Sequence, residues 1–185
     1  PQVGNFYNSW SGYEDELVWG AAWLYRATGD AYYLGEAQKY YSNHVGEMFS
    51  WDDKTAGAQV LLAQLTGDGG YTGDVLNYYS HLKNQAKRTP KGLIWLSQWG
   101  SNRYASNAAF LMMHGKKLDR MSPSDQNEYF ELGKSQIDYV LGNGGRSYVV
   151  GMGQNPPQQP HHRSSSCPGK SLQFIPFDII SFALV

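Results

Sequence analysis

The sequence predicts an all-α fold, and two observations carry this prediction. Six stretches of the chain have apolar residues spaced three and four apart, as on one face of a helix, with few β-branched runs between them. Two of the joints between these stretches repeat the sequence Thr-Gly-Asp, at residues 28–30 and 66–68. Because a tight turn between two helices is typical of an antiparallel hairpin, we expect the helices to pair.

The first helix is expected at residues 15–28. Leu17 and Leu24 share one of its faces, while Trp19 and Trp23 lie four residues apart on another. Apolar side chains on two faces predict that the helix is buried on both sides.

The start of this helix has two local signals. Ser11 and Glu14 have the spacing of a capping box, in which each side chain bonds a free backbone N–H of the first turn. The acidic residues 14–16 also suit the positive end of a helix. Both signals support a helix start in this region.

Five stretches with the same periodicity follow the first. With 185 residues, 41% of them apolar, the chain can bury the core of one ordinary domain. From Gly142 the composition changes to Gly, Pro, Gln and Ser, which predicts an ordered loop or a functional surface rather than a linker. The remaining helices are expected at residues 31–45, 53–65, 74–87, 103–114 and 125–141.

Composition excludes several classes of function. The net charge of −1 and the scattered Lys and Arg residues give no basic stripe for nucleic acid. No segment reaches the roughly 18 to 20 apolar residues of a membrane span, and no Gly-x-Ser-x-Gly or phosphate loop occurs. The single cysteine, Cys167, rules out an internal disulfide and a cysteine zinc cluster.

The aromatic composition favours one kind of ligand. The 14 Tyr and 6 Trp, against 7 Phe, provide rings that suit sugar surfaces.

One segment combines stiff backbone with ionisable groups. Residues 147–163 read SYVVGMGQNPPQQPHHR, in which glycines and prolines lead directly to His161, His162 and Arg163. In a generic proline-rich loop, an incidental His-Arg pair on the surface would be the default interpretation.

A family resemblance changes this interpretation. The segment is similar to a signature of glycoside hydrolase family 9, the endoglucanases, and the chain most resembles the animal and bacterial members. The resemblance extends through residues 10–17, 51–53 and 136–142, and reaches about Lys170. The signature residues are Ser147, Val149, Val150, Gly151, Gly153, Asn155, Pro160, His161 and Arg163.

This resemblance implies both a fold and a reaction. The family fold is an (α/α)6 barrel of six helical hairpins, of which this chain would supply about the C-terminal half without the final part. Members cleave internal β-1,4-glucosidic bonds of cellulose with inversion, which needs a general acid and a general base about 6.5 to 9.5 Å apart. The resemblance further implies a secreted enzyme that is monomeric when complete.

The resemblance also implies site residues. His161 and Arg163 would bond sugar hydroxyls beside the scissile bond as supporting residues, not as acid or base. A metal at His161 and His162 is disfavoured, since adjacent imidazoles rarely aim at one ion. Stacking and hydrogen bonding to the glucan would fall to Tyr7, Trp10, Trp99 and Arg103; core packing is the alternative for such rings, and the default for Trp19, Trp23 and Trp95.

A calcium site is a further implication of the resemblance. Carboxylate and backbone oxygens are the ligands that calcium prefers. The alternative is helix capping by Ser11 beside solvated acids, and Asp53 could replace Asp52. The implied calcium residues are Ser11, Gly12, Asp15, Glu16 and Asp52.

The chain departs from the family in its carboxylates. The family base is an Asp in an Asp-Ala-Gly-Asp-like motif, and the family acid is a Glu well after the His-Arg loop; neither motif occurs here. We assign residues 1–170 to a partial catalytic domain, and interpret residues 171–185, SLQFIPFDIISFALV, as a non-family tail from a gene-model error. The isolated chain is therefore expected to be inactive. The alternatives are a non-catalytic helical carbohydrate-binding or scaffold protein, and an (α/α) barrel enzyme for another polysaccharide.

Overall fold

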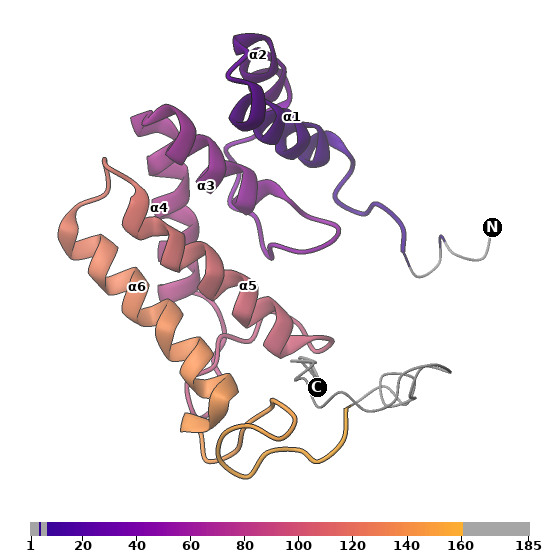
Figure 1. Cartoon of the computed structure of the whole chain (residues 1–185), viewed down its shortest axis with the longest axis vertical. Coiled ribbons are helices and arrows are strands. Elements are labelled where there is room, and N and C mark those ends of the chain that lie inside the picture. Colours follow the sequence, from indigo (N-terminus) through magenta and orange to yellow (C-terminus); the bar gives the residue numbers. More distant parts are fainter. Residues whose placement is uncertain (1–3, 5–6, 161–185) are drawn as a thin grey trace, which may run out of the picture.

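A computed structural model describes residue 4 and residues 7–160, and this part of the chain is helical (Figure 1). Its six α-helices form three antiparallel pairs, which confirms the all-α prediction and the hairpin pairing. These residues contain no strand, only an isolated bridge between Arg88 and Ile94, and no helix long and apolar enough to cross a membrane. The helices are α1 (Glu14–Thr28), α2 (Ala31–Tyr40), α3 (Thr55–Thr66), α4 (Gly69–Asn84), α5 (Ser101–His114) and α6 (Pro123–Asp138).

The two Thr-Gly-Asp turns have the same structure. Gly29 ends α1 with a φ of 71°, and Gly67 ends α3 with a φ of 65°, a left-handed conformation that favours glycine. Asp30 and Asp68 then cap the following helix, each accepting a hydrogen bond from the backbone N–H two residues later, at 2.9 and 2.6 Å. One tripeptide thus ends one helix and begins the next.

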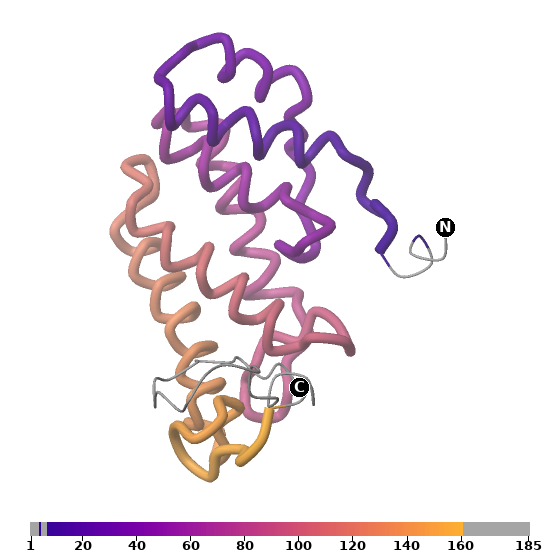
Figure 2. The backbone as a smooth tube through the Cα atoms, turned by 45° about the vertical axis from the view of Figure 1, so that its right-hand side comes forward, coloured from indigo at the N-terminus to yellow at the C-terminus, as the bar shows by residue number. Residues whose placement is uncertain are grey.

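The longer connections gather at one end of the molecule. The turns within the hairpins, including the 3₁₀ turn η2 (Gly115–Lys117), lie at the opposite end, because paired helices run antiparallel. In Figures 1 and 2 the N-terminal segment and the connections before α3 and α5 project on the same side. The segment after α6 joins them through a buried cluster that includes Leu93 and Val149. We call this region the loop end; it comprises residues 7–13, 41–54, 85–100 and 139–160.

Helix α3 lies at the centre of the described structure. Its residues Thr55–Ala63 are all buried, as expected for an apolar helix with neighbours on several sides. It contacts α1, α4 and α5, and separates two apolar clusters. One lies between α1, α2 and α3 and contains Leu62; the other, between α3 and α6, contains Tyr79 and Met112. Burial of one large apolar side chain, such as Leu62 or Met112, stabilises the folded state by about 1.5 to 3 kcal/mol.

The second helix is shorter than predicted. It ends at Tyr40, whereas we expected helical structure to Val45. The chain turns away because the buried side chain of Gln59, on α3, donates hydrogen bonds to the carbonyls of Ser42 and His44 at 3.2 and 3.0 Å. Periodicity along the chain contains no signal for such a long-range partner.

The fourth helix starts earlier than predicted, at Gly69 instead of Asp74. Two glycines in its first turn weaken the helical pattern, but the cap by Asp68 fixes the start. The other predicted helix ends agree with the structure to within three residues. Beyond α6, residues Tyr139–Asn143 form a π-helical turn, η3.

Two predictions about α1 are wrong. Ser11 does not cap the helix; its hydroxyl donates instead to the carbonyl of Asp52, 41 residues away, at 2.6 Å. The helix is also buried on one face only, since Leu17, Trp23 and Leu24 remain 41, 42 and 47% exposed. Leu17 and Leu24 line a groove of about 320 Å³ between α1 and α2.

Candidate functional site at the loop end

Three aromatic side chains meet where the N-terminal segment touches the connection before α3. The ring of Trp51 contacts the rings of Tyr7 and Trp10 edge-on, with centroids 5.5 and 5.7 Å apart. Each of the three keeps more than 40% of its surface exposed. We call them the aromatic cluster. Exposed rings held by edge contacts present flat apolar faces, as the C–H side of a pyranose requires.

Asp52 holds this segment in place. The Trp10 backbone N–H donates to Asp52 Oδ1 at 3.0 Å, and the Ser11 hydroxyl donates to the Asp52 carbonyl at 2.6 Å. The residue next to Trp51 thereby orients the chain that carries Trp10. A side chain predicted as a calcium ligand thus acts here as a hydrogen-bond acceptor.

Another exposed ring precedes α5. Trp99 is 80% exposed, and Gly100 after it has a φ of 67°. A Cβ at Gly100 would lie 2.9 Å from the Arg103 guanidinium, so glycine lets that group lie against the backbone. Arg103 donates to the Tyr104 hydroxyl at 2.7 Å and lies 4.5 Å from that ring's centroid. Its Nε is buried without a hydrogen-bond partner in the described structure, while the side chain as a whole is half-buried.

The segment after α6 is folded onto the same end, as expected for an ordered loop. The buried Ser147 donates its backbone N–H to the carbonyl of Gln154 at 2.6 Å. A Cβ at Gly153 would overlap the carbonyl oxygen of Leu141, so this close approach requires glycine.

The structure therefore places the predicted substrate residues Tyr7, Trp10 and Trp99 at the loop end, and Arg103 next to it in the first turn of α5. The predicted supporting residues, His161 and Arg163, lie outside the described residues, although they directly follow the described part of this loop.

The implied calcium residues form two adjoining groups. In the first, Ser11 bonds Asp52, and the Gly12 carbonyl accepts a hydrogen bond from the Ser9 hydroxyl. In the second, Asp15 and Glu16 are neighbours at the start of α1. Three His, Cys, Asp or Glu side chains do not gather around one point anywhere in residues 7–160. The Asp52 carboxylate consequently does not complete a triad with the two acids. Asp53, its possible replacement, caps α3 by accepting from the Thr55 N–H at 2.8 Å.

Asp15 and Glu16 form a pair of neighbouring carboxylates, each with one unsatisfied oxygen. Asp15 Oδ1 and Glu16 Oε2 are buried and lack hydrogen-bond partners in the described structure. Burial, followed by the hydrogen bond and the negative charge of Asp15, raises the pKa of Glu16 above its usual value of 4.5. The Lys54 ammonium lies 4.0 Å from Glu16 Oε1 and offsets part of this charge. Two unsatisfied carboxylate oxygens are what a hard cation would bind.

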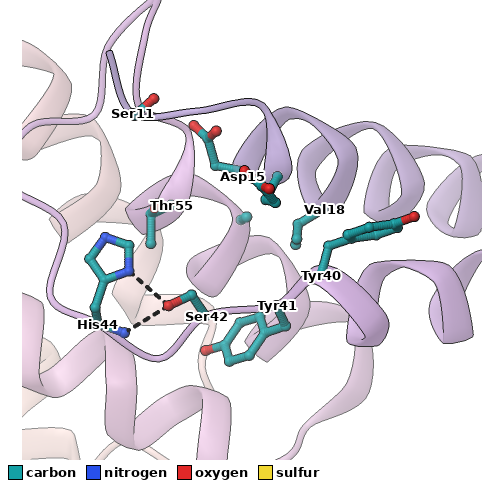
Figure 3. Close-up of a pocket in the computed structure, with 10 residues that line it drawn as sticks. Ser11, Asp15, Val18, Tyr40, Tyr41, Ser42, His44 and Thr55 are labelled. Atoms are coloured by element: carbon teal, nitrogen blue, oxygen red, sulfur yellow. Dashed lines mark hydrogen bonds between the residues drawn. The ribbon is translucent and has the colours of Figure 1, made fainter. Parts of the chain in front are cut away.

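A cavity of about 360 Å³ adjoins Asp15 (Figure 3), whereas Glu16 lines the groove between α1 and α2. Asp15 lines it from α1, and Tyr40 and Tyr41 line it from the end of α2. On the far wall the Ser42 hydroxyl lies 2.8 Å from Nδ1 of His44. The cavity gives space for solvent next to Asp15.

Comparison with known proteins assigns the chain to a family. The model of glycosyl hydrolase family 9 matches residues 1–175. The chain belongs to glycosyl hydrolase family 9. This family consists of glycoside hydrolases, and its (α/α)6 barrel accounts for the three hairpins as part of a larger ring.

Family 9 relatives match nearly the whole chain with part of their own length. Endoglucanase 15 of Arabidopsis thaliana is 40% identical over 90% of this chain and 39% of the relative. The structure of an endoglucanase from the termite Nasutitermes takasagoensis is 48% identical with a TM-score of 0.81, over 90% of this chain and 38% of that one. Endoglucanase CelQ from Clostridium thermocellum, in complex with cellotriose, is 39% identical with a TM-score of 0.82, over 89% and 30%. The chain thus spans less than two fifths of these family 9 proteins.

The sequence analysis missed Trp51 as a site residue. A positional signal was present, since a tryptophan stands within four residues before each of α1, α3 and α5: Trp10, Trp51 and Trp99. These three helices all begin at the loop end, so their preceding rings must gather there.

Proposed function

We propose that this chain forms the glucan-binding half of a secreted endo-β-1,4-glucanase that inverts configuration. The observation that carries the proposal is that three exposed tryptophans, Trp10, Trp51 and Trp99, lie at one end of a family 9 fold. The CelQ relative, 39% identical, holds cellotriose and cellotetraose in two of its structures, which supports a β-1,4-glucan as the ligand.

The described side chains bind and orient the sugar. The aromatic cluster and Trp99 offer flat apolar faces to pyranose rings, and the half-buried guanidinium of Arg103 donates to a sugar oxygen. His161 and Arg163 assist by bonding hydroxyls near the scissile bond. Inversion also needs an acid to protonate the leaving oxygen and a base to activate water. In our proposal both groups come from parts of the enzyme outside this chain, which then has no activity alone.

The groove between α1 and α2 supports a larger barrel. Leu17 and Leu24 are more than 40% exposed along it, and Tyr32 of α2, at 65%, lines the same groove. In a closed ring of hairpins, the preceding hairpin would pack on this apolar surface. In the complete, monomeric enzyme the groove is then part of the core.

We further propose that the Asp15–Glu16 pair binds calcium, with hydroxyl and carbonyl oxygens of Ser11, Gly12 and Asp52, but not the Asp52 carboxylate, as the other ligands. The two unpartnered carboxylate oxygens favour a cation there, and calcium accepts carboxylate, hydroxyl and carbonyl oxygens together. The ion would fix the start of α1 to the connection before α3, and thereby the aromatic cluster. It takes no part in bond cleavage.

A chimera tests this function. Residues 1–160 would replace the matching segment of the termite endoglucanase, which is 48% identical, and carboxymethylcellulose hydrolysis would be followed with the anomeric form of the product. We expect hydrolysis with inversion by the chimera, and cellotetraose binding without turnover by the 185-residue chain alone. Hydrolysis by the chain alone would refute the assignment of acid and base to other parts. A folded chimera that binds cellotetraose without turnover would favour a non-catalytic binding protein.

A further inference from the structure

A second cavity at the loop end is lined by residues to which the proposed glucan hydrolysis assigns no role. It has a volume of about 320 Å³ and lies between the turn at residues 89–92 and the segment 139–148. We call it the basic pocket; its walls include Pro90, Lys91, Tyr139, Gly144, Arg146 and Tyr148.

Hydrogen bonds fix both walls of the basic pocket. On one side, the Gly92 N–H donates to the Thr89 carbonyl at 2.9 Å and closes a tight turn with Lys91 near its tip. On the other, the Gly145 N–H closes a second turn at 2.8 Å. The Lys91 ammonium donates to the Gly144 carbonyl and joins the two turns. The pocket is thus formed before any ligand enters.

The basic pocket carries positive charge that forms no ion pair with an acid in residues 7–160. Neither Lys91 nor Arg146 makes an ion pair in residues 7–160. The stretches 85–118 and 139–160 contain no Asp or Glu at all. The nearest acid in the sequence, Asp138, is paired with Lys134 at 2.6 Å. Two cations without counter-charges favour an anionic ligand.

The same pocket has an aromatic wall. The rings of Tyr139 and Tyr148 are almost parallel, with an interplanar angle of 8° and centroids 6.0 Å apart. Both rings are half-buried, so each is held in position by its surroundings. An inorganic anion would use the cations and leave the rings without a partner, whereas a sugar ring would use both.

We propose that the basic pocket binds a pyranose that bears a carboxylate, that is, a uronic acid. The planar guanidinium of Arg146 can hold a carboxylate with two parallel hydrogen bonds, and Lys91 adds a second charge. The tyrosines pack on the ring and their hydroxyls bond its hydroxyl groups. Such a site would let the enzyme hold the acidic branches of a polysaccharide beside its neutral glucan site. The binding itself does not depend on the proposed hydrolysis.

Titration calorimetry of the 185-residue chain with sodium D-glucuronate tests the proposal. D-Glucose and inorganic phosphate, at equal ionic strength, separate the contributions of the carboxylate and the ring. We expect glucuronate to bind more tightly than either. Arg146→Gln should weaken glucuronate binding by at least about tenfold. Arg146→Lys should weaken it less, because lysine keeps the positive charge but cannot make the two parallel hydrogen bonds of a guanidinium.

Lys87→Gln is the matched control, since Lys87 lies in the same connection as Lys91, before α5, but does not line the pocket. It should leave glucuronate binding unchanged. Absence of glucuronate binding, phosphate binding as tight as that of glucuronate, or equal losses in the Lys87 and Arg146 variants would each overturn the proposal. All variants alter exposed side chains, and helical circular dichroism checks that they fold.

Discussion

The carboxylate of Asp15, in the first turn of α1, accepts a hydrogen bond from the backbone N–H of Lys54, directly before α3, at 2.6 Å. The two residues are 39 positions apart in the sequence. Helix α3 has no side-chain cap from Lys54 itself, so Asp15 satisfies an N–H at the helix start from another helix. The contact joins the start of α1, which holds the proposed calcium pair, to the start of α3, and the segments before these two helices carry the aromatic cluster.

Removal of this acceptor should destabilise the fold. Asp15→Ala leaves the Lys54 N–H without its partner, and we expect the free energy of unfolding to fall by about 1 to 3 kcal/mol in a urea titration. Asp15→Asn keeps an oxygen acceptor and should lose less. Asp119→Ala, which changes an exposed acid before α6, should stay within about 0.5 kcal/mol of the parent. Equal losses for Asp15→Ala and Asp119→Ala would contradict the role of the contact.

The stability of the chain should also depend on the ionisation of Glu16. Its pKa in the folded state is raised above 4.5, chiefly by burial and then by Asp15. The folded state therefore binds this proton more tightly than the unfolded state, and stability falls as pH rises from 4.5 through the raised pKa. Glu16→Gln removes this loss, so its stability relative to the parent should increase with pH across that window. Unfolding midpoints in metal-free buffer measure the effect.

Glu47→Gln controls for the loss of one negative charge from an exposed position on the connection before α3. The same pH-dependent gain in both variants would show that overall charge, and not the Asp15–Glu16 pair, is responsible.

Calcium binding should offset the destabilisation caused by the two neighbouring carboxylates, Asp15 and Glu16. An ion that binds only the folded state raises the free energy of unfolding by about 2.7 kcal/mol at one hundred times its Kd. We expect the thermal midpoint to rise with calcium chloride and to rise less with magnesium chloride, because magnesium demands a stricter octahedron. Asp15→Ala should abolish the calcium effect. An unchanged midpoint in calcium, or an equal shift with magnesium, would argue against the site.

Local signals in the sequence were sufficient for the helices and their tight turns. Each Thr-Gly-Asp turn is predictable because its hydrogen bonds join residues at most four apart. The end of α2 and the role of Ser11 were not predictable, because Gln59 and Asp52 act across 15 to 41 residues.

The candidate site follows the same division. Tyr7, Trp10 and Trp99 could be identified one by one as rings near helix starts, but their common end of the molecule depends on how the hairpins pair. The basic pocket could not be foreseen, because Lys91 and Arg146 are brought together only by two turns that bond each other.

Stacking by Trp99 should contribute to glucan affinity. Its ring is 80% exposed, so Trp99→Ala removes little core packing but deletes a flat face, and we expect about a tenfold loss of cellotetraose affinity by titration calorimetry. Trp23→Ala is the matched control, because Trp23 is also exposed, at 42%, but lies further along α1, away from the loop end. A loss of similar size in both variants would indicate non-specific binding to exposed rings.

Two helical glycines should respond in opposite ways to alanine. A Cβ at Gly57 of α3 would overlap the Phe49 ring. This ring packs against Trp19 and against the apolar cluster that contains Tyr79 and Met112. Since the ring must shift within a packed region, Gly57→Ala should lower the free energy of unfolding by about 1 to 3 kcal/mol, despite the better helix propensity of alanine. At Gly73 of α4 a Cβ would have no neighbouring atom within 4 Å, so Gly73→Ala should raise the free energy of unfolding by about 0.5 to 1 kcal/mol. Urea titrations of both variants measure the contrast. If Gly57→Ala stabilises the protein, the Phe49 ring is not packed tightly against Gly57.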